Sequence, residues 1–310
     1  MKLGGSCMCT SHPTALTRSE RLDAGRIAGL LEEPRWASPE AFQLDHHTST
    51  FQTPRLKTLG EPMSTRSIAR GLRSDNPAVI TRALRRFVRL LGTDAETGQR
   101  KATWQESYDA FEEEDVEPHL LRHADSEDDA TRELAMDGLA VWLGEAALAK
   151  LLERAVDEVV EVRASAIGGL EGWPDSVEAL DTLVAAADEG EWNVRWRAAR
   201  ALARFTDSEA VNALFGALLD PDSNVRCTAG DALIHHDPAT ILPRLRGYFD
   251  HPSAHMLDSA LELMGEIGGP EEAKFLAKVG AWTNLSQPSQ VRRWARDASK
   301  RIKERQKSRA

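Results

Sequence analysis

Three residues in the C-terminal half carry side chains that could do metal or nucleophilic chemistry. Cys227, Asp231 and His235 follow one another at four-residue spacing, which on a helix places them along one face. A thiol, a carboxylate and an imidazole each bind transition metals, and a thiol beside an imidazole can act as a nucleophile. The outer two would lie about 12 Å apart along a helix, so one ion could not bind all three directly. We favour the alternative, a polar face in which Asp231 pairs with Arg200.

A second group of potential metal ligands lies near the N-terminus. Cys7 and Cys9 with His12 supply part of a closed four-ligand zinc site, and His46 and His47 are the other candidates nearby. The alternative, which we favour, is a pair of reduced thiols in a flexible segment. The chain shows no Ser-His-Asp arrangement, phosphate loop or dinucleotide fingerprint, so we expect no cofactor, no metal and no catalytic residue.

A basic and aromatic row lies between residues 191 and 205. Trp196, Arg197, Arg200 and Arg204 fall within a sector of roughly 100° around a helix axis. The opposite face is apolar, with residues at offsets of 0, 4, 7, 8 and 11: Val194, Ala198, Ala201, Leu202 and Phe205. The segment is therefore predicted to form an amphipathic helix that buries one face and presents indole and guanidinium groups on the other.

The same apolar stripe recurs along the chain. Its first positions are separated by 31, 32, 31, 31 and 35 residues: Thr131, Val162, Val194, Val225, Met256 and Val291. A fainter copy begins at Ile80. An arginine directly follows the first position in five copies: Arg132, Arg163, Arg195, Arg226 and Arg292. An acid precedes three of these arginines by six residues: Asp157, Glu189 and Asp220. A fixed period of this length predicts a solenoid, in which stacking supplies the core that a single unit lacks.

The acid, the Val-Arg pair and the alanines and leucine behind it together resemble the HEAT-like repeat first associated with phycobilin lyases. The resemblance covers roughly residues 63–300, and it departs from the pattern at Met256-Leu257, where the arginine is missing, and at the N-terminal copy. It implies an all-α, right-handed α-solenoid of paired helices whose second helices line a concave surface.

On that concave surface we expect a partner-binding site formed by six residues: Trp196, Arg197, Arg200, Arg204, Asp231 and His235. Arginine and tryptophan dominate binding hot spots, and three guanidiniums suit an acidic segment of a partner protein. The alternative is a solvated face, with Arg200 paired to Asp231 and Trp196 partly covered by the neighbouring repeat.

The chain is predicted to have three parts. Residues 1–62, punctuated by proline, serine and threonine, form a flexible N-terminal arm, and Met63 could be the natural start. Residues 63–300 form the solenoid, with an insertion near 93–116. In this insertion Trp104, Tyr108 and Phe111 have the spacing of an extra helix that packs by its aromatic edge. Residues 301–310 form a basic tail.

Composition and charge narrow the function classes. The chain is 41% hydrophobic and 28% charged, which is typical of a soluble globular protein. It has no apolar run of the roughly 20 residues that span a bilayer. Its start lacks the apolar core of a secretory signal, so we expect a cytoplasmic protein that does not bind membranes.

The net charge of −10 is unevenly spread. Residues 274–310 carry eleven basic and two acidic groups, and because residues 1–62 are balanced, residues 63–273 carry −19. The basic end could bind nucleic acid or another polyanion through six residues: Arg292, Arg293, Arg296, Lys300, Arg301 and Lys303. The alternative is a solubilising cap for the last repeat.

The function we expect is a non-catalytic protein-binding scaffold or adaptor, with a protein partner that the sequence does not identify. Two alternatives stay open. One is a bilin-lyase-like maturation factor, which the resemblance implies, and the other is a polyanion binder that uses the basic C-terminus.

Overall fold

The computed structural model describes residues 64–92, 103–144, 146–247, 249, 258–281 and 289–309, and the regular structure within these ranges is helical. The predicted N-terminal arm, the cysteine and histidine candidates within it, and the start of the predicted insertion lie outside the described residues. Among the helices described, none combines the length and the apolar character that crossing a bilayer requires.

The helices follow one another in pairs. The first and second helices of the pairs are α2 (Thr65–Leu72) and α3 (Pro77–Leu91), α5 (Glu117–Ala124) and α6 (Asp129–Trp142), α7 (Ala147–Arg154) and α8 (Val160–Gly169), α9 (Val177–Ala186) and α10 (Trp192–Leu202), α11 (Ser208–Ala217) and α12 (Ser223–Leu233), α13 (Pro238–Gly247) and α14 (Asp258–Ile267), and α15 (Pro270–Ala281) and α16 (Ser289–Arg309). Helix α4 (Trp104–Glu113) lies between the first two pairs in the chain, and a 3₁₀ turn, η4 (Leu170–Gly172), extends α8.

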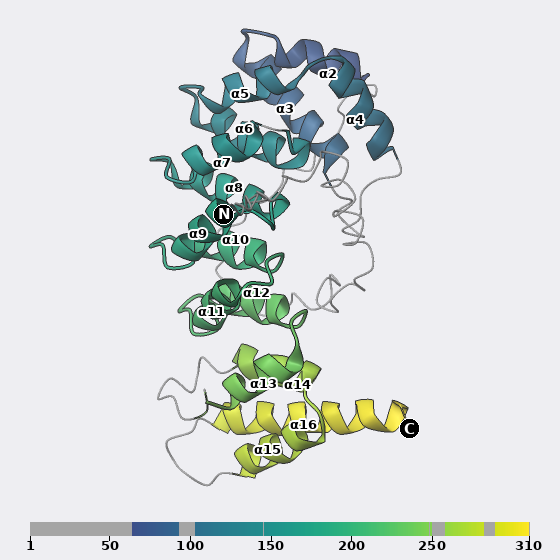
Figure 1. The fold of residues 1–310 in the computed structure, drawn as a ribbon, viewed down its shortest axis with the longest axis vertical. Helices are drawn as coiled ribbons and strands as arrows, with labels where there is room; N and C mark the ends of the chain where they lie inside the picture. The colour runs from purple at the N-terminus through teal and green to yellow at the C-terminus, as the bar shows by residue number, and fades with distance from the viewer. Residues whose placement is uncertain are drawn as a thin grey trace, which may run out of the picture. The chain divides into compact units, whose positions relative to one another are not determined.

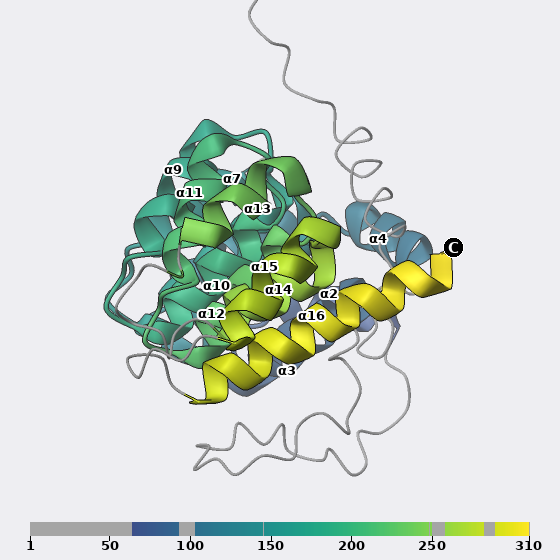
Figure 2. The same ribbon diagram turned by 90° about the horizontal axis from the view of Figure 1, so that it is seen from below.

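The pairs stack in two rows (Figures 1 and 2). The second helices α3, α6, α8, α10, α12, α14 and α16 form one row, in which each helix contacts the next. The first helices α5, α7, α9 and α11 form the other row. This arrangement is an α-solenoid, as the period of the apolar stripe predicts.

The core is built from that stripe. On α10, Val194, Ala198, Ala201, Leu202 and Phe205 are all buried. The bulky residues at the same place in two earlier repeats, Trp142 and Trp173, are buried as well. Alanines in the middle of each stripe let neighbouring second helices approach closely, and the larger residues at its ends fill the space between the two rows.

Helix α4 packs on the first pair through aromatic side chains, as its spacing predicts. Trp104, Tyr108 and Phe111 are buried. The Tyr108 ring stacks on Trp142 with centroids 4.5 Å apart, and Phe111 lies 4.8 Å from Phe87. The Trp104 Nε1–H donates a hydrogen bond of 2.8 Å to the carbonyl at the end of α3. These contacts tie α4 to the core of the solenoid.

The last helix is longer than expected. We predicted a separate basic tail from residue 301, but α16 continues to Arg309 and its Ile302 is buried. The Arg305 guanidinium donates to the carbonyls of Gly265 and Gly268 at the end of α14, at 2.9 and 2.6 Å. The reason is visible in the spacing, because Ile302 adds the eleventh-residue position to the stripe that begins at Val291.

Candidate functional site

The recurring arginines hold each repeat to the next. Arg195 donates from Nη1 to the carbonyls of Glu189 and Gly190 in its own turn, at 2.9 and 2.8 Å. Its Nε and Nη2 donate to the two carboxylate oxygens of Asp220 in the following repeat, at 2.6 and 3.0 Å. The same bridge joins Arg132 to Asp157, with 3.4 Å between Nε and Oδ2, and Arg163 to Glu189, with 2.9 Å between Nη2 and Oε1.

We call this series of bridges between the arginines and acids of successive repeats the arginine ladder. Its acids also accept hydrogen bonds from backbone N–H groups in their own turns. Asp157 Oδ1 accepts from the N–H of Val159 at 3.0 Å, and Asp220 Oδ1 accepts from the N–H of Asp222 at 2.8 Å. Burial by itself would raise the pKa of Asp157, but the hydrogen bonds from Val159 and Arg132 outweigh it and hold this pKa below its usual value. These arginines and acids are therefore engaged in structure and are not available to a ligand.

The face of α10 opposite its buried stripe carries Trp196, Arg197 and Arg200, which are not part of these bridges between repeats. Trp196 is half-buried. The Cζ atoms of Arg197 and Arg200 lie 5.4 and 5.5 Å from the centroid of its ring, within the range of a cation–π interaction. One indole and two guanidiniums thus form a compact group on the row of second helices.

Arg197 reaches back from this group across α8. A Cβ atom at Gly168 would lie 3.1 Å from the Cδ and Nη1 atoms of Arg197, so the absence of a side chain at residue 168 makes the room. Burial lowers the pKa of Arg197 and the charge of Arg200 lowers it further, while the charges of Asp137, Glu171 and Glu133 oppose the change. Arg197 therefore lies over Gly168 of α8, where the charges of Asp137 and Glu133 on α6 act on it.

Asp137 is the deepest of these acids. Burial raises its pKa, and the charge of Arg197 and a hydrogen bond with the Ser165 side chain oppose the rise. Burial also raises the pKa of Glu133, one turn away on α6, and the charge of Asp137 adds to the rise. Sequence analysis did not single out Glu133 or Asp137, although the small residues Ser165 and Gly168 on the same face of α8 were a signal.

The predicted pairing of Arg200 with Asp231 is wrong. Arg200 instead lies 3.7 Å from Glu171, which is carried by the 3₁₀ turn that follows α8. Both side chains of this pair are more than two-fifths exposed, at 44% and 46%, so the attraction is weak. Arg204 is exposed and has no ion-pair partner among the described residues.

The residues with metal-binding side chains on α12 do not assemble. Cys227 and His235 are exposed, and Asp231 between them is half-buried. Burial and the negative charge of Glu262 raise the pKa of Asp231 to about 6. Within the described ranges, no three His, Cys, Asp or Glu side chains form a group that could hold a metal ion.

Three of the six basic residues predicted to bind a polyanion lie beside acids. Arg293 lies 3.9 Å from Asp297 on α16. Lys300 lies 3.7 Å from Glu304. Arg301 lies 3.8 and 3.9 Å from Glu262 and Glu266 on α14. The Nε–H of Arg296 donates to the carbonyl of Arg292 at 3.2 Å, whereas Lys303 lies on the side of α16 that faces α15. Arg292 and Arg296 also lie against α15, at Gly280, so Lys303 shares their side of α16 and is separated from Arg301.

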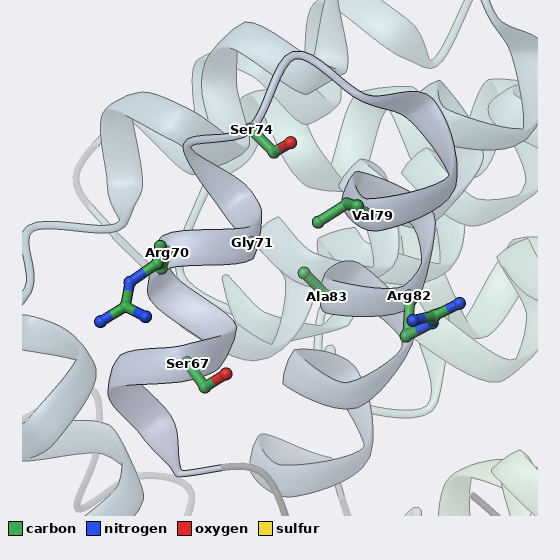
Figure 3. Close-up of a pocket in the computed structure, with 7 residues that line it drawn as sticks. All are labelled: Ser67, Arg70, Gly71, Ser74, Val79, Arg82 and Ala83. Carbon is green, nitrogen blue, oxygen red and sulfur yellow. The ribbon is translucent and has the colours of Figure 1, made fainter.

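A hollow of about 320 Å³ between α2 and α3 does not gather its charged groups. It is lined by two serines, two arginines and three small or apolar residues (Figure 3). Figure 3 shows the side chains of Arg70 and Arg82 pointing to opposite sides, away from each other. An anion in this hollow could not contact both guanidiniums.

The geometry defines an all-α protein of stacked helix pairs. One of its second helices, α10, carries a group of basic and aromatic side chains on the face opposite its buried stripe. Residues 148–222 match the HEAT repeats family. The matched residues run from α7 to α11, and the repeats in this part of the solenoid are HEAT-like.

Comparison with curated proteins gives no match. Matches among solved structures include computationally designed armadillo repeat proteins for modular peptide recognition, at 16% identity and a TM-score of 0.45 over 77% of this chain and 100% of theirs. They also include the complex of CpcE and CpcF of phycocyanin lyase from Nostoc sp. PCC7120, at 16% identity and a TM-score of 0.45 over 83% of this chain and 99% of that one. The description of the repeats as HEAT-like rests on the match over residues 148–222 and on the helix pairs themselves.

Proposed function

We propose that this chain is a non-catalytic protein-binding scaffold that holds an acidic segment of a partner protein on the outward face of α10. The observation that carries the proposal is the group of Trp196, Arg197 and Arg200, in which two guanidiniums lie 5.4 and 5.5 Å from one half-buried indole. Arginine and tryptophan contribute most to protein interfaces because they combine large contact area with directed hydrogen bonds.

The arginines of this face differ in burial, and this difference supports the proposal that the face binds a partner. Arg197 is half-buried over Gly168, with the acids of α6 acting on its charge, so it holds the indole in place from within the protein. Arg200 and Arg204 are exposed and can donate to a ligand. A site whose parts are already fixed loses less conformational entropy when the partner binds.

Within the chain itself, Glu171 competes with a partner carboxylate for Arg200. Its 3.7 Å pair with Arg200 is exposed and therefore weak, so a partner carboxylate that also reaches Arg204 can displace it. A bidentate contact between an arginine and a carboxylate is stronger and more directional than this pair. The surroundings favour one particular residue on the partner, an aspartate or glutamate that takes the place of Glu171.

The test is capture of proteins from the native cell by the full chain, with identification by mass spectrometry. We expect Arg200→Glu with Arg204→Glu to lose a defined set of proteins that the unchanged chain retains. The matched control is Arg70→Glu with Arg82→Glu, which makes the same change of charge on exposed arginines of α2 and α3. Arg197 is left alone, because reversing a half-buried charge would disturb the fold.

Two results would contradict the proposal. One is retention of the same set of proteins by the Arg200 and Arg204 variant. The other is equal loss from the control variant, which would show that net charge and not the α10 surface decides capture. Unchanged helical circular dichroism and melting temperature in both variants are required for the comparison.

A further inference from the structure

The basic residues of α16 fall into two groups that face different neighbours. Arg301 and Arg305 lie towards α14, where Arg301 meets Glu262 and Glu266 and Arg305 binds carbonyls at the end of the helix. Lys303 lies about 200° around the helix axis from Arg301 and faces α15. Lys303 therefore lies on a different side of α16 from Arg301, the side on which Arg292 and Arg296 also meet α15.

That surface contains a recess of about 500 Å³ formed by three helices. Arg246 from α13 and Lys303 from α16 line it, together with a run of residues on α15 that includes Lys274, Phe275 and Lys278. Recesses of a few hundred Å³ are of the size that small ligands occupy. Four cationic side chains, one acid (Glu271) and one aromatic ring thus line the recess.

The acids near the recess are already paired. Glu271 accepts from the ammonium group of Lys274 at 2.8 Å. The buried Glu272 accepts from the Nη2 of Arg246 and from the N–H of Gly269 at 2.9 Å. For Lys278 and Lys303, the part of the chain that the structure describes offers no ion-pair partner. Two ammonium groups are therefore left to contact a ligand.

Phe275 gives the recess an apolar wall in a fixed place. Its ring meets Phe249 edge to face, with centroids 5.1 Å apart. The guanidinium of Arg246 lies 5.8 Å from the centroid of the Phe275 ring and is itself held by Glu272. The ring is half-buried, so part of it is left to meet a ligand in the recess.

We propose that this recess binds a nucleoside phosphate, with the phosphate oxygens on Lys278 and Lys303 and the base against Phe275. Ammonium groups bind phosphate through charge-assisted hydrogen bonds, and an aromatic side chain provides a surface on which any base can stack. A compact ligand fits better than a long nucleic acid, because residues 63–273 carry −19 and repel a polyanion that extends beyond the recess.

The first experiment is calorimetric titration of the full chain with ADP, with pyrophosphate and with adenosine, each at low and at high salt. We expect ADP to bind at least about tenfold more tightly than either fragment, since only ADP contacts both the lysines and the ring. Binding of ADP should weaken at high salt because two ammonium contacts are screened.

The second experiment uses variants, with circular dichroism and melting to monitor the fold. Lys278→Gln with Lys303→Gln should lose at least about tenfold in ADP affinity. Arg70→Gln with Arg82→Gln removes the same charge from exposed positions of α2 and α3, outside the recess, and should leave binding unchanged. Phe275→Leu should weaken ADP and leave pyrophosphate as it was.

Several results would overturn this inference. They are failure of ADP to bind, equal affinity for pyrophosphate and ADP, equal loss in the control variant, or binding of a ten-nucleotide single strand without binding of ADP. None of them bears on the α10 surface, because the lysine variants leave Arg200 and Arg204 intact. Failure of this inference and failure of the proposed function are therefore separate outcomes.

Discussion

At the scale of single residues, Asp231 is the acid whose surroundings are least favourable to its charge. It is half-buried on α12, and the charge that acts on it is the negative one of Glu262. Burial and that repulsion raise its pKa from 3.8 to about 6. The expected partner, Arg200, lies near Glu171 instead, so the carboxylate gains no compensation from the nearest arginine in register.

The consequence is a pH dependence of stability. Because the pKa of Asp231 is higher in the folded state than in the unfolded chain, the folded state binds the proton more tightly, and stability falls as the pH rises from about 4 to about 6. The rise of the pKa from 3.8 to about 6 corresponds to roughly 3 kcal/mol, and partial solvation of the side chain reduces this to about 1–2 kcal/mol. We expect Asp231→Asn to be more stable than the unchanged chain by that amount at pH 8 and equal to it at pH 4.

Urea unfolding at the two pH values measures the difference. Asp181→Asn, at an exposed position of α9, is the control for loss of one negative charge and should show no such change. A stabilisation by Asp231→Asn that is the same at pH 4 and pH 8 would contradict the explanation.

At the scale of elements, the sequence predicted what lies within one helix better than what lies between helices. The stripe from Val194 to Phe205 predicted the buried face of α10, because each helix repeats the same 3.6-residue geometry. The partner of Arg200 could not be predicted. Glu171 and Asp231 lie at similar distances along the chain in opposite directions, and the 3₁₀ turn after α8 carries the former.

The arginine ladder shows the same limit. A spacing of six residues joined Asp220 to Arg226 in the sequence, and in the structure Arg226 donates to the Asp220 carbonyl at 2.9 Å. The carboxylate of Asp220, however, binds Arg195, 25 residues earlier. Sequence spacing predicted that the two residue types belong together, but only the stacking of repeats decides which copy meets which.

We expect the ladder to contribute to coupling between repeats. Arg195→Met leaves Asp220 buried with its charge uncompensated and removes the donor from two turn carbonyls, so it should cost about 2–4 kcal/mol in urea unfolding. The exposed Arg200→Met should cost less than about 0.5 kcal/mol.

A double-mutant cycle with Asp220→Asn isolates the bridge between the repeats. The double variant should be less destabilised than the sum of the two single variants by at least about 1 kcal/mol. Additive effects would show that the 2.6 Å contact contributes no coupling between the repeats.

At the scale of the whole molecule, the basic charge of the C-terminal end and its packing on the last repeats must be considered together. Residues 274–310 are strongly basic and the preceding repeats are acidic, which from sequence alone leaves open both a polyanion-binding end and a solubilising cap for the last repeat. In the structure much of that charge serves the protein itself, since Arg301 faces Glu262 and Arg305 binds the end of α14. A solenoid needs such a terminal unit, because its last repeat has no neighbour to cover its apolar face.

The last turns of α16 should therefore stabilise the fold. Deleting residues 301–310 removes the buried Ile302, worth about 1.5–3 kcal/mol of apolar burial, and leaves the carbonyls of Gly265 and Gly268 without Arg305. We expect the melting temperature to fall by several degrees. Hydrogen exchange should show a greater loss of protection in the C-terminal repeats than elsewhere. Deleting only residues 306–310 keeps Ile302, Lys303 and Arg305 and is the matched control, expected to melt with the full chain. Equal melting temperatures for both deletions and the full chain would mean that α16 past residue 300 is not part of the folded unit, although Ile302 extends the stripe of its helix.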